Sequence, residues 1–172
     1  MSRSRLLCLS GTSGGSSPSL TSDVMRPDAM TQKDLFAALG APLANPRWSW
    51  GAVRPDGVVF LRVWQDHVER RKGNVLVKIA FRATPKEDHE GDSLGHRERL
   101  QHVERIKEGA TTFLIMCQAE DVTAAPRKVK DFEHENVFRG GRLRKIAGEC
   151  WIELGARIPV RDVTNPTVRP AA

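Results

Sequence analysis

Apolar residues recur with helical spacing in a short segment that begins near residue 31. Leu35 and Leu39 fall on one side of a helix over residues 31–39, Thr31 is a suitable N-cap, and Gly40 is a typical stop. The pattern therefore predicts a short amphipathic helix at the start of the patterned sequence.

Shorter apolar runs with alternation predict strands further along the chain. Residues 50–53 and 58–64 read as a β-hairpin, because the Arg-Pro-Asp-Gly sequence at 54–57 is typical of a tight turn. A third, strongly apolar strand is predicted over residues 74–81, and a buried strand over residues 111–118.

The clearest helix is predicted over about residues 94–108, with Gly109 as its stop. Leu100, Val103 and Ile106 form its predicted apolar face. The rest of its surface is polar or basic and includes Arg97, Arg99, His102 and Arg105.

The last third of the chain alternates basic and apolar residues. Gly140 and Gly141 predict a hairpin turn within the basic stretch 127–145, and a final strand is predicted over residues 150–160. About five to seven strands and two helices, in an order that is not β-α-β throughout, are typical of an α+β fold. We therefore predict a small curled sheet or β-barrel with two or three helices.

The two ends of the chain differ in composition from its middle. Residues 1–29 are rich in Ser, Gly, Thr and Pro without an apolar period, which predicts a disordered N-terminal tail. The patterned sequence begins at Met30, so a start codon assigned too far upstream, with Met25 or Met30 as the true start, is the alternative explanation. We predict one domain over residues 30–163 and a loose tail over residues 164–172.

The charge balance is basic. The 172 residues include 27 Lys and Arg against 21 Asp and Glu, which gives a formal net charge of +6. Such a balance favours polyanions through phosphate contacts. No apolar run approaches the roughly 18 residues of a membrane span, and the three dispersed cysteines indicate neither a disulfide framework nor a zinc site. These features predict a cytoplasmic protein that does not enter a membrane.

Two tryptophans separated by one serine stand out in the sequence, and a third ends the predicted hairpin. An indole offers a flat ring and one donor, so such rings suit a stacking site for a nucleobase. Burial of Trp50 and Trp64 in the core is the alternative. The predicted base-binding residues are Trp48, Ser49, Trp50, Trp64 and Asp66.

Basic side chains on the long helix and on the late basic stretch are the predicted phosphate contacts. Lys128 and Lys130 would share one face of a strand, which suits a phosphate track. An ordinary solvated strand face is the alternative. The predicted phosphate-binding residues are Arg97, Arg99, Arg105, Arg127, Lys128 and Lys130.

No catalytic residue, metal site or cofactor is predicted. The acids and histidines at Asp88, His89, Glu90, Asp92 and His96 lack the spacing of a zinc motif. The rival hypothesis is a small metal-dependent nuclease, which would need carboxylates that converge within metal reach. Its candidate acids are Asp66, Asp88, Asp92, Asp121 and Asp131.

Four segments taken together carry a family resemblance: residues 48–51, 59–66, 97–107 and 126–132. They resemble the PUA-like fold and, more narrowly, EVE/ASCH-type readers of modified bases, domains that also accompany HNH nucleases in modification-dependent restriction systems. The resemblance implies a curled barrel closed by a helix and a flipped, modified base held in an aromatic pocket. This chain departs from that pattern because it has no tyrosine and no nuclease signature.

The sequence therefore predicts a binding module for DNA or RNA rather than an enzyme. It would recognise an extruded base by tryptophan stacking and by basic side chains that contact the nucleic-acid backbone. The resemblance implies that this base is modified. Cleavage would need a nuclease partner, for which the module would act as a specificity subunit. A structural domain in which every tryptophan is core is the third reading.

Overall fold

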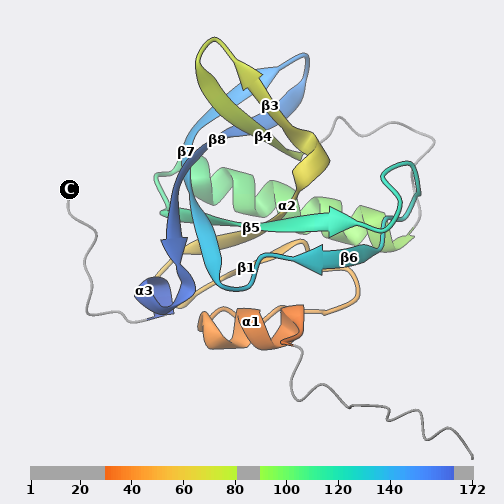
Figure 1. Cartoon of the computed structure of the whole chain (residues 1–172), viewed down its shortest axis with the longest axis vertical. Coiled ribbons are helices and arrows are strands. Elements are labelled where there is room, and N and C mark those ends of the chain that lie inside the picture. The colour runs from red at the N-terminus through yellow and green to blue at the C-terminus, as the bar shows by residue number, and fades with distance from the viewer. Residues whose placement is uncertain (1–29, 81–89, 165–172) are drawn as a thin grey trace, which may run out of the picture.

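The computed structural model describes residues 30–80 and 90–164, with side chains in the second range from residue 94 onward. In this part of the chain, three α-helices and an eight-stranded mixed sheet form an α+β domain (Figure 1). The predicted α+β class is therefore confirmed. The predicted N-terminal tail and all but Thr164 of the predicted C-terminal tail lie outside the described residues.

The elements follow one another in an order close to the predicted one. They are α1 (Gln32–Ala38), β1 (Gly51–Val53), β2 (Val59–Trp64), the 3-10 turn η1 (Gln65–His67), β3 (Val68–Arg71), β4 (Asn74–Ala80), α2 (Glu90–Lys107), β5 (Thr112–Ala119), β6 (Val129–Phe132), β7 (Asn136–Ile146), β8 (Glu149–Pro159) and α3 (Val160–Thr164).

The sheet is curled but open. Its strand order is β1-β2-β5-β7-β8-β4-β3, with β6 paired to β5 off this path. All pairings are antiparallel except that of β2 with β5, which is parallel. Because β1 and β3 end the path without pairing to each other, the predicted closed barrel is not observed in the described residues.

Local sequence accounts for the start and end of α1. The Thr31 hydroxyl accepts a hydrogen bond from the Asp34 N–H at 3.2 Å, and the Asp34 carboxylate accepts one from the Thr31 N–H at 3.1 Å. This reciprocal pair is a capping box, which satisfies otherwise unpaired donors at the helix start. Gly40 follows the helix with a φ of 71°, a left-handed conformation that glycine adopts without strain.

The glycine pair at Gly140 and Gly141 does not form a turn. Both residues lie inside β7, where the pairing with β8 shifts register on either side of Gly140. A Cβ atom on Gly140 would lie 2.7 Å from the end of the Ile152 side chain, and one on Gly141 would lie 2.9 Å from the Glu153 Cβ, so a larger residue at either position would displace side chains of β8. The prediction of a turn was wrong, because these glycines serve a bulged, tightly packed strand pair. The actual turn is at Ala147 and Gly148, with φ values of 51° and 86°.

Two hydrophobic cores lie on opposite faces of the sheet. One packs α1 against the sheet and includes Phe36, Phe60, Phe113 and Ile115. The other packs α2 against the concave side, and its buried members are Val59, Leu61, Val63, Val77, Ile79, Ala80, Val103, Ile106, Leu114 and Ile152. Figure 1 shows α1 and α2 on either side of β5. Of the helices in the described ranges, none has both the length and the apolar character to cross a bilayer.

Candidate functional site

The tryptophan pair of the 48–51 segment is fixed to α2 by one carboxylate. Glu98 accepts a hydrogen bond from the Ser49 hydroxyl at 2.9 Å and another from the Trp50 N–H at 2.7 Å. The Ser49 hydroxyl also accepts from the Asn45 N–H at 3.0 Å, and Ser49 is fully buried. Its side chain therefore holds the loop in place, and we leave Ser49 out of the base contacts considered below.

The same segment approaches α2 at a glycine. A Cβ atom on Gly95 would lie 2.5 Å from the Trp50 indole nitrogen and 2.6 Å from the Trp48 carbonyl oxygen. The Trp50 ring meets His96 edge to face, at 6.3 Å between ring centroids. Trp48 and Trp50 are both half-buried, so each ring is partly open to solvent and partly held by the helix.

The Arg99 side chain of α2 is buried against the sheet instead of facing solvent. Its side chain donates to the carbonyl oxygens of Trp50 at 2.5 Å, Arg62 at 2.7 Å and Ile79 at 3.2 Å, and the residue is 2% exposed. Burial lowers the pKa of the guanidinium to about 9, and the nearby charge of Arg62 lowers it further, so the group keeps its charge at neutral pH. We leave Arg99 out of the phosphate contacts, because the residue is buried and main-chain oxygens accept from both of its terminal nitrogens.

The buried face of α2 differs from the predicted one. Arg99, His102, Val103 and Ile106 are buried, whereas Leu100 is 43% exposed. The prediction placed Leu100 inside because it is apolar. The helix turns instead so that Arg99 can reach the carbonyl groups of Arg62 on β2, Ile79 on β4 and Trp50 just before β1. Leu100, one residue along, then faces outward.

Two further polar groups are buried beside Arg99. Burial lowers the pKa of His102 to about 4, and the charges of Arg99 and Arg105 act in the same direction. Burial raises the pKa of the Cys117 thiol to about 11, although the Arg62 charge opposes that change. A thiol with so high a pKa carries almost no thiolate at neutral pH, so Cys117 is a structural residue.

Trp64, Asp66 and Arg127 come together at the carboxyl end of β2. The Arg127 guanidinium lies 5.7 Å from the Trp64 ring centroid and pairs with Asp66 at 2.8 Å. The Arg127 side chain is 22% exposed, and that of Asp66 is 31% exposed. Trp64 is half-buried and packs against the core on the α1 side. Residues predicted for base and for phosphate contacts therefore form one cluster.

The other predicted cations lie on exposed surfaces. Lys128 and Lys130 are exposed next to Arg127, and Arg97 and Arg105 are exposed on α2. The pairing of β5 with β6 skips Lys130, which is a bulge. The regular alternation predicted for Lys128 and Lys130 is therefore interrupted.

A hollow opens beside this cluster, on the concave side of the sheet. Along one edge, β5 pairs first with β7 and then with β6, and the link 133–135 crosses between them. The Glu133 N–H donates to the Met116 carbonyl at 2.8 Å and holds this link against β5. The link and its neighbours on β5, β6, β7 and β8 line this hollow, which has a volume of about 480 Å³.

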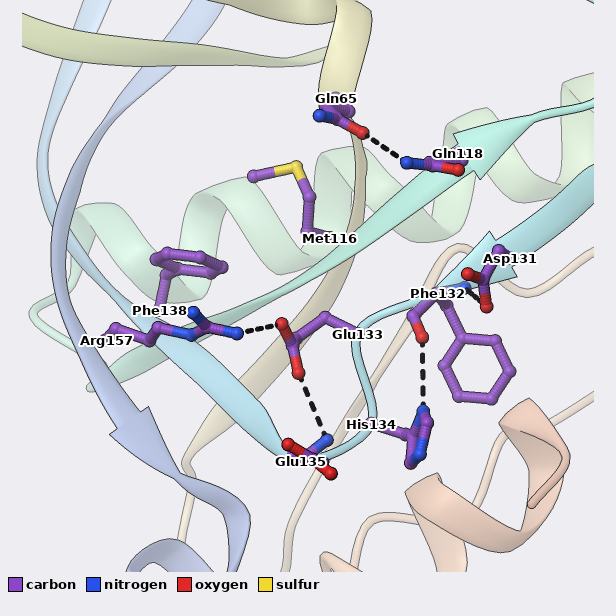
Figure 2. Close-up of a pocket in the computed structure, with 10 residues that line it drawn as sticks. All are labelled: Gln65, Met116, Gln118, Asp131, Phe132, Glu133, His134, Glu135, Phe138 and Arg157. Atoms are coloured by element: carbon purple, nitrogen blue, oxygen red, sulfur yellow. Dashed lines mark hydrogen bonds and ion pairs between the residues drawn. The ribbon is translucent and has the colours of Figure 1, made fainter. Parts of the chain in front are cut away.

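The hollow combines an apolar floor with polar walls (Figure 2). Met116 and Phe138 supply the apolar part, and the Gln118 amide donates to the Gln65 side-chain oxygen at 2.9 Å. The Arg157 guanidinium lies 6.0 Å from the Phe138 ring centroid. The lining residues are Gln65, Met116, Gln118, Asp131, Phe132, Glu133, His134, Glu135, Phe138 and Arg157.

Glu133 organises the lower wall of the hollow. One of its oxygens accepts from the Glu135 and Asn136 N–H groups, each at 3.2 Å, and the other pairs with Arg157. Burial alone would raise the pKa of Glu133, but the Asn136 side chain and the Arg157 charge lower it below its ordinary value. Glu133 is therefore an ionised scaffold residue whose hydrogen-bonding capacity is largely used.

The acids proposed for a nuclease do not converge in the described residues. Asp66 pairs with Arg127, Asp121 accepts from the Thr123 N–H at 2.8 Å, and Asp131 lines the hollow. Within residues 30–80 and 94–164, no group of three or more potential ligands could hold a metal ion. Asp88 and His89, and the side chains of Glu90 and Asp92, lie outside the described residues. No observation on the described carboxylates therefore favours the nuclease.

The sequence reading missed most of the hollow. Gln65, Gln118, Glu133 and Arg157 come from four separate segments, and none belongs to a recognisable motif. Asp131 is the one lining residue that the sequence singled out, as a candidate acid of the rival nuclease. For the other lining residues, the only indication in the sequence was the interruption of the strand pattern near residues 133–135.

No protein-family model, no curated protein and no solved structure matches the chain.

Proposed function

We propose that the chain is a nucleic-acid-binding module whose polymer-binding surface is the cluster of Trp64, Asp66 and Arg127 together with the adjoining hollow. One observation carries the proposal. The Arg127 guanidinium lies over the Trp64 ring while it pairs with Asp66, so an aromatic, a cation and a carboxylate meet beside a hollow of a size that suits a small ligand.

Arg127 is held ready for a phosphate or a base edge. A single nitrogen, Nη1, makes both contacts with the two Asp66 oxygens, at 2.8 and 3.1 Å. The remaining guanidinium donors keep a fixed direction because the group is stacked and paired. Arginine in such a position suits bidentate recognition of phosphate.

The neighbouring lysines provide the non-specific part of binding. Lys128 and Lys130 are exposed and lie one and three residues after Arg127. Each phosphate that they neutralise would release counterions, which makes affinity fall with salt. Trp48, half-exposed near α2, supplies a second ring on which a neighbouring base could stack at about 1–3 kcal/mol.

The finer assignment, a PUA-like domain that reads a flipped and modified base, belongs to the same proposal. A curled sheet with a helix across its concave side supports it, although the closed barrel is absent. Extrusion of a base costs a few kcal/mol, which stacking and edge hydrogen bonds would offset. Cleavage of the bound polymer would require a separate nuclease.

Binding of labelled oligonucleotides tests the proposal. Fluorescence anisotropy would compare single and double strands, modified and unmodified, DNA and RNA, at about 50 and 200 mM salt. The Lys128→Ala/Lys130→Ala variant should lower the magnitude of the salt slope by about 1.4 on single strands, or 0.7 per lost phosphate contact. Arg127→Ala should weaken binding at both salt concentrations.

The charge-matched control is the Lys107→Ala/Lys145→Ala variant. Both lysines are exposed, at the end of α2 and near the end of β7. This variant should keep the wild-type slope. The proposal is wrong if no oligonucleotide binds in a salt-dependent manner, or if Arg127→Ala and Trp64→Leu leave affinity unchanged.

A further inference from the structure

The hollow has an acidic lining in a chain whose net charge is positive. Asp131, Glu133 and Glu135 line it against a single arginine, Arg157, whereas the whole sequence carries a formal charge of +6. A phosphate group entering this space would meet carboxylates at close range. The part of a nucleic acid that fits the hollow is therefore a base, while the backbone stays outside on Arg127 and the lysines.

We propose that the hollow selects bases that carry an exocyclic amino group, namely cytosine, adenine or guanine, and disfavours uracil and thymine. This inference rests on the proposed nucleic-acid binding and adds the chemical class of base that the site accepts. It concerns the edge of the base rather than the presence of a modification.

The acceptor that makes the selection is Asp131. Its Oδ1 accepts from the Phe132 N–H at 2.8 Å, which fixes the carboxylate and leaves Oδ2 as an acceptor. Asp131 is exposed and stands opposite Gln118 in the β5–β6 register, so a carboxylate and an amide are adjacent on one wall. Glu133 cannot serve in the same way because main-chain donors and Arg157 occupy its oxygens.

An aromatic and a cation complete the site. Phe138 is half-buried in the lining, with the Arg157 guanidinium 6.0 Å from its ring centroid. Figure 2 shows Phe138 and Arg157 at one end of the hollow and Gln118 and Asp131 at the other, with Met116 between them. A base that lies over Met116 would present its edge to Asp131, and the amino group of cytosine would then donate to this carboxylate. Uracil would direct a carbonyl oxygen to the same carboxylate, and two acceptors repel each other.

The test compares oligo(dC) with oligo(dU), each of about 12 nucleotides, a length within the range that small single-strand-binding domains cover. The two polymers share a backbone and differ in the base edge. We expect oligo(dC) to bind the wild-type chain about tenfold more tightly than oligo(dU), as one well-placed edge contact allows. In Asp131→Asn, an amide that both donates and accepts replaces the carboxylate, so the preference should fall to about twofold or less.

Asp162→Asn is the matched control, because it removes the same charge from an exposed residue of α3 and should keep the tenfold preference. Equal affinity of the wild-type chain for both polymers, or an unchanged preference in Asp131→Asn, overturns the selection by the hollow while the proposed function stands. If neither polymer binds, the proposed function fails and the selection fails with it.

Discussion

The guanidinium of Arg99 donates a hydrogen bond of 2.7 Å to the carbonyl oxygen of Arg62, and so ties α2 to an edge of β2. A second bond from Arg99 reaches the Ile79 carbonyl on β4, a strand that does not pair with β2. One side chain therefore bridges the seam where the curled sheet remains open. The bridge replaces ladder hydrogen bonds that a closed barrel would have supplied.

Replacement of Arg99 by methionine should destabilise the domain severely. Three buried carbonyl groups would lose their donor, at about 1–3 kcal/mol each, while methionine fills part of the volume. We expect the free energy of unfolding to fall by about 3–5 kcal/mol in urea denaturation. Arg97→Met, at an exposed position of the same helix, should change it by less than about 0.5 kcal/mol. Equal effects of both variants would refute the seam argument.

Glu98→Gln should loosen the tryptophan segment without unfolding the domain. Glutamine keeps one acceptor oxygen, but its NH2 group replaces the other. One of the two hydrogen bonds, from the Ser49 hydroxyl or from the Trp50 N–H, is therefore lost. The expected loss of stability is about 1–3 kcal/mol, the range for bonds to a charged group. Tryptophan fluorescence should shift to longer wavelength as Trp48 and Trp50 gain solvent. Glu104→Gln, exposed on the same helix, is the control, and a shift of the same size in that variant would contradict the anchoring role.

Protonation of His102 should make the domain acid-sensitive. Its pKa is about 4 in the folded chain against an ordinary 6.5, so the unfolded chain binds the proton first as pH falls. Stability is therefore full above about pH 6.5 and declines towards pH 4, by on the order of 3 kcal/mol. His67, whose pKa burial also lowers, acts in the same direction.

The difference between the wild type and His102→Gln isolates this contribution. Carboxylates titrate equally in both chains and cancel from the difference. Urea denaturation at several pH values should give a wild-type curve that is steeper than that of the variant between about pH 6.5 and pH 4. Parallel curves would show that His102 is not responsible.

Segments with strong local signals were predicted well. The Arg-Pro-Asp-Gly turn located the first hairpin, and Gly109 marked the end of α2 to within a residue or two. β5 was recognised by its continuous apolar run. In these cases the residue pattern and the final environment agree, because the fold adds packing but does not alter the local preference.

Other features depend on distant partners and could not be predicted. β3, Val68–Arg71, has only one apolar residue and is a strand because β4 pairs with it. Arg99 is buried because three carbonyl groups converge on it from separate segments, namely β2, β4 and the residue before β1. Trp64, Asp66 and Arg127 were each proposed from side-chain chemistry, yet their meeting follows from the parallel pairing of β2 with β5, which no short segment encodes.

The parallel pairing of β2 and β5 also governs when the hollow can form during folding. Gln65 and Gln118 are 53 positions apart, and the hydrogen bond between them closes a loop that contains β3, β4 and α2. Contacts of such sequence separation pay a large loop-closure entropy and tend to form late, whereas the β1–β2 hairpin can form early. The wall of the hollow is thus a late product of folding, and a chain released before β5 is synthesised would contain the hairpin but not the hollow.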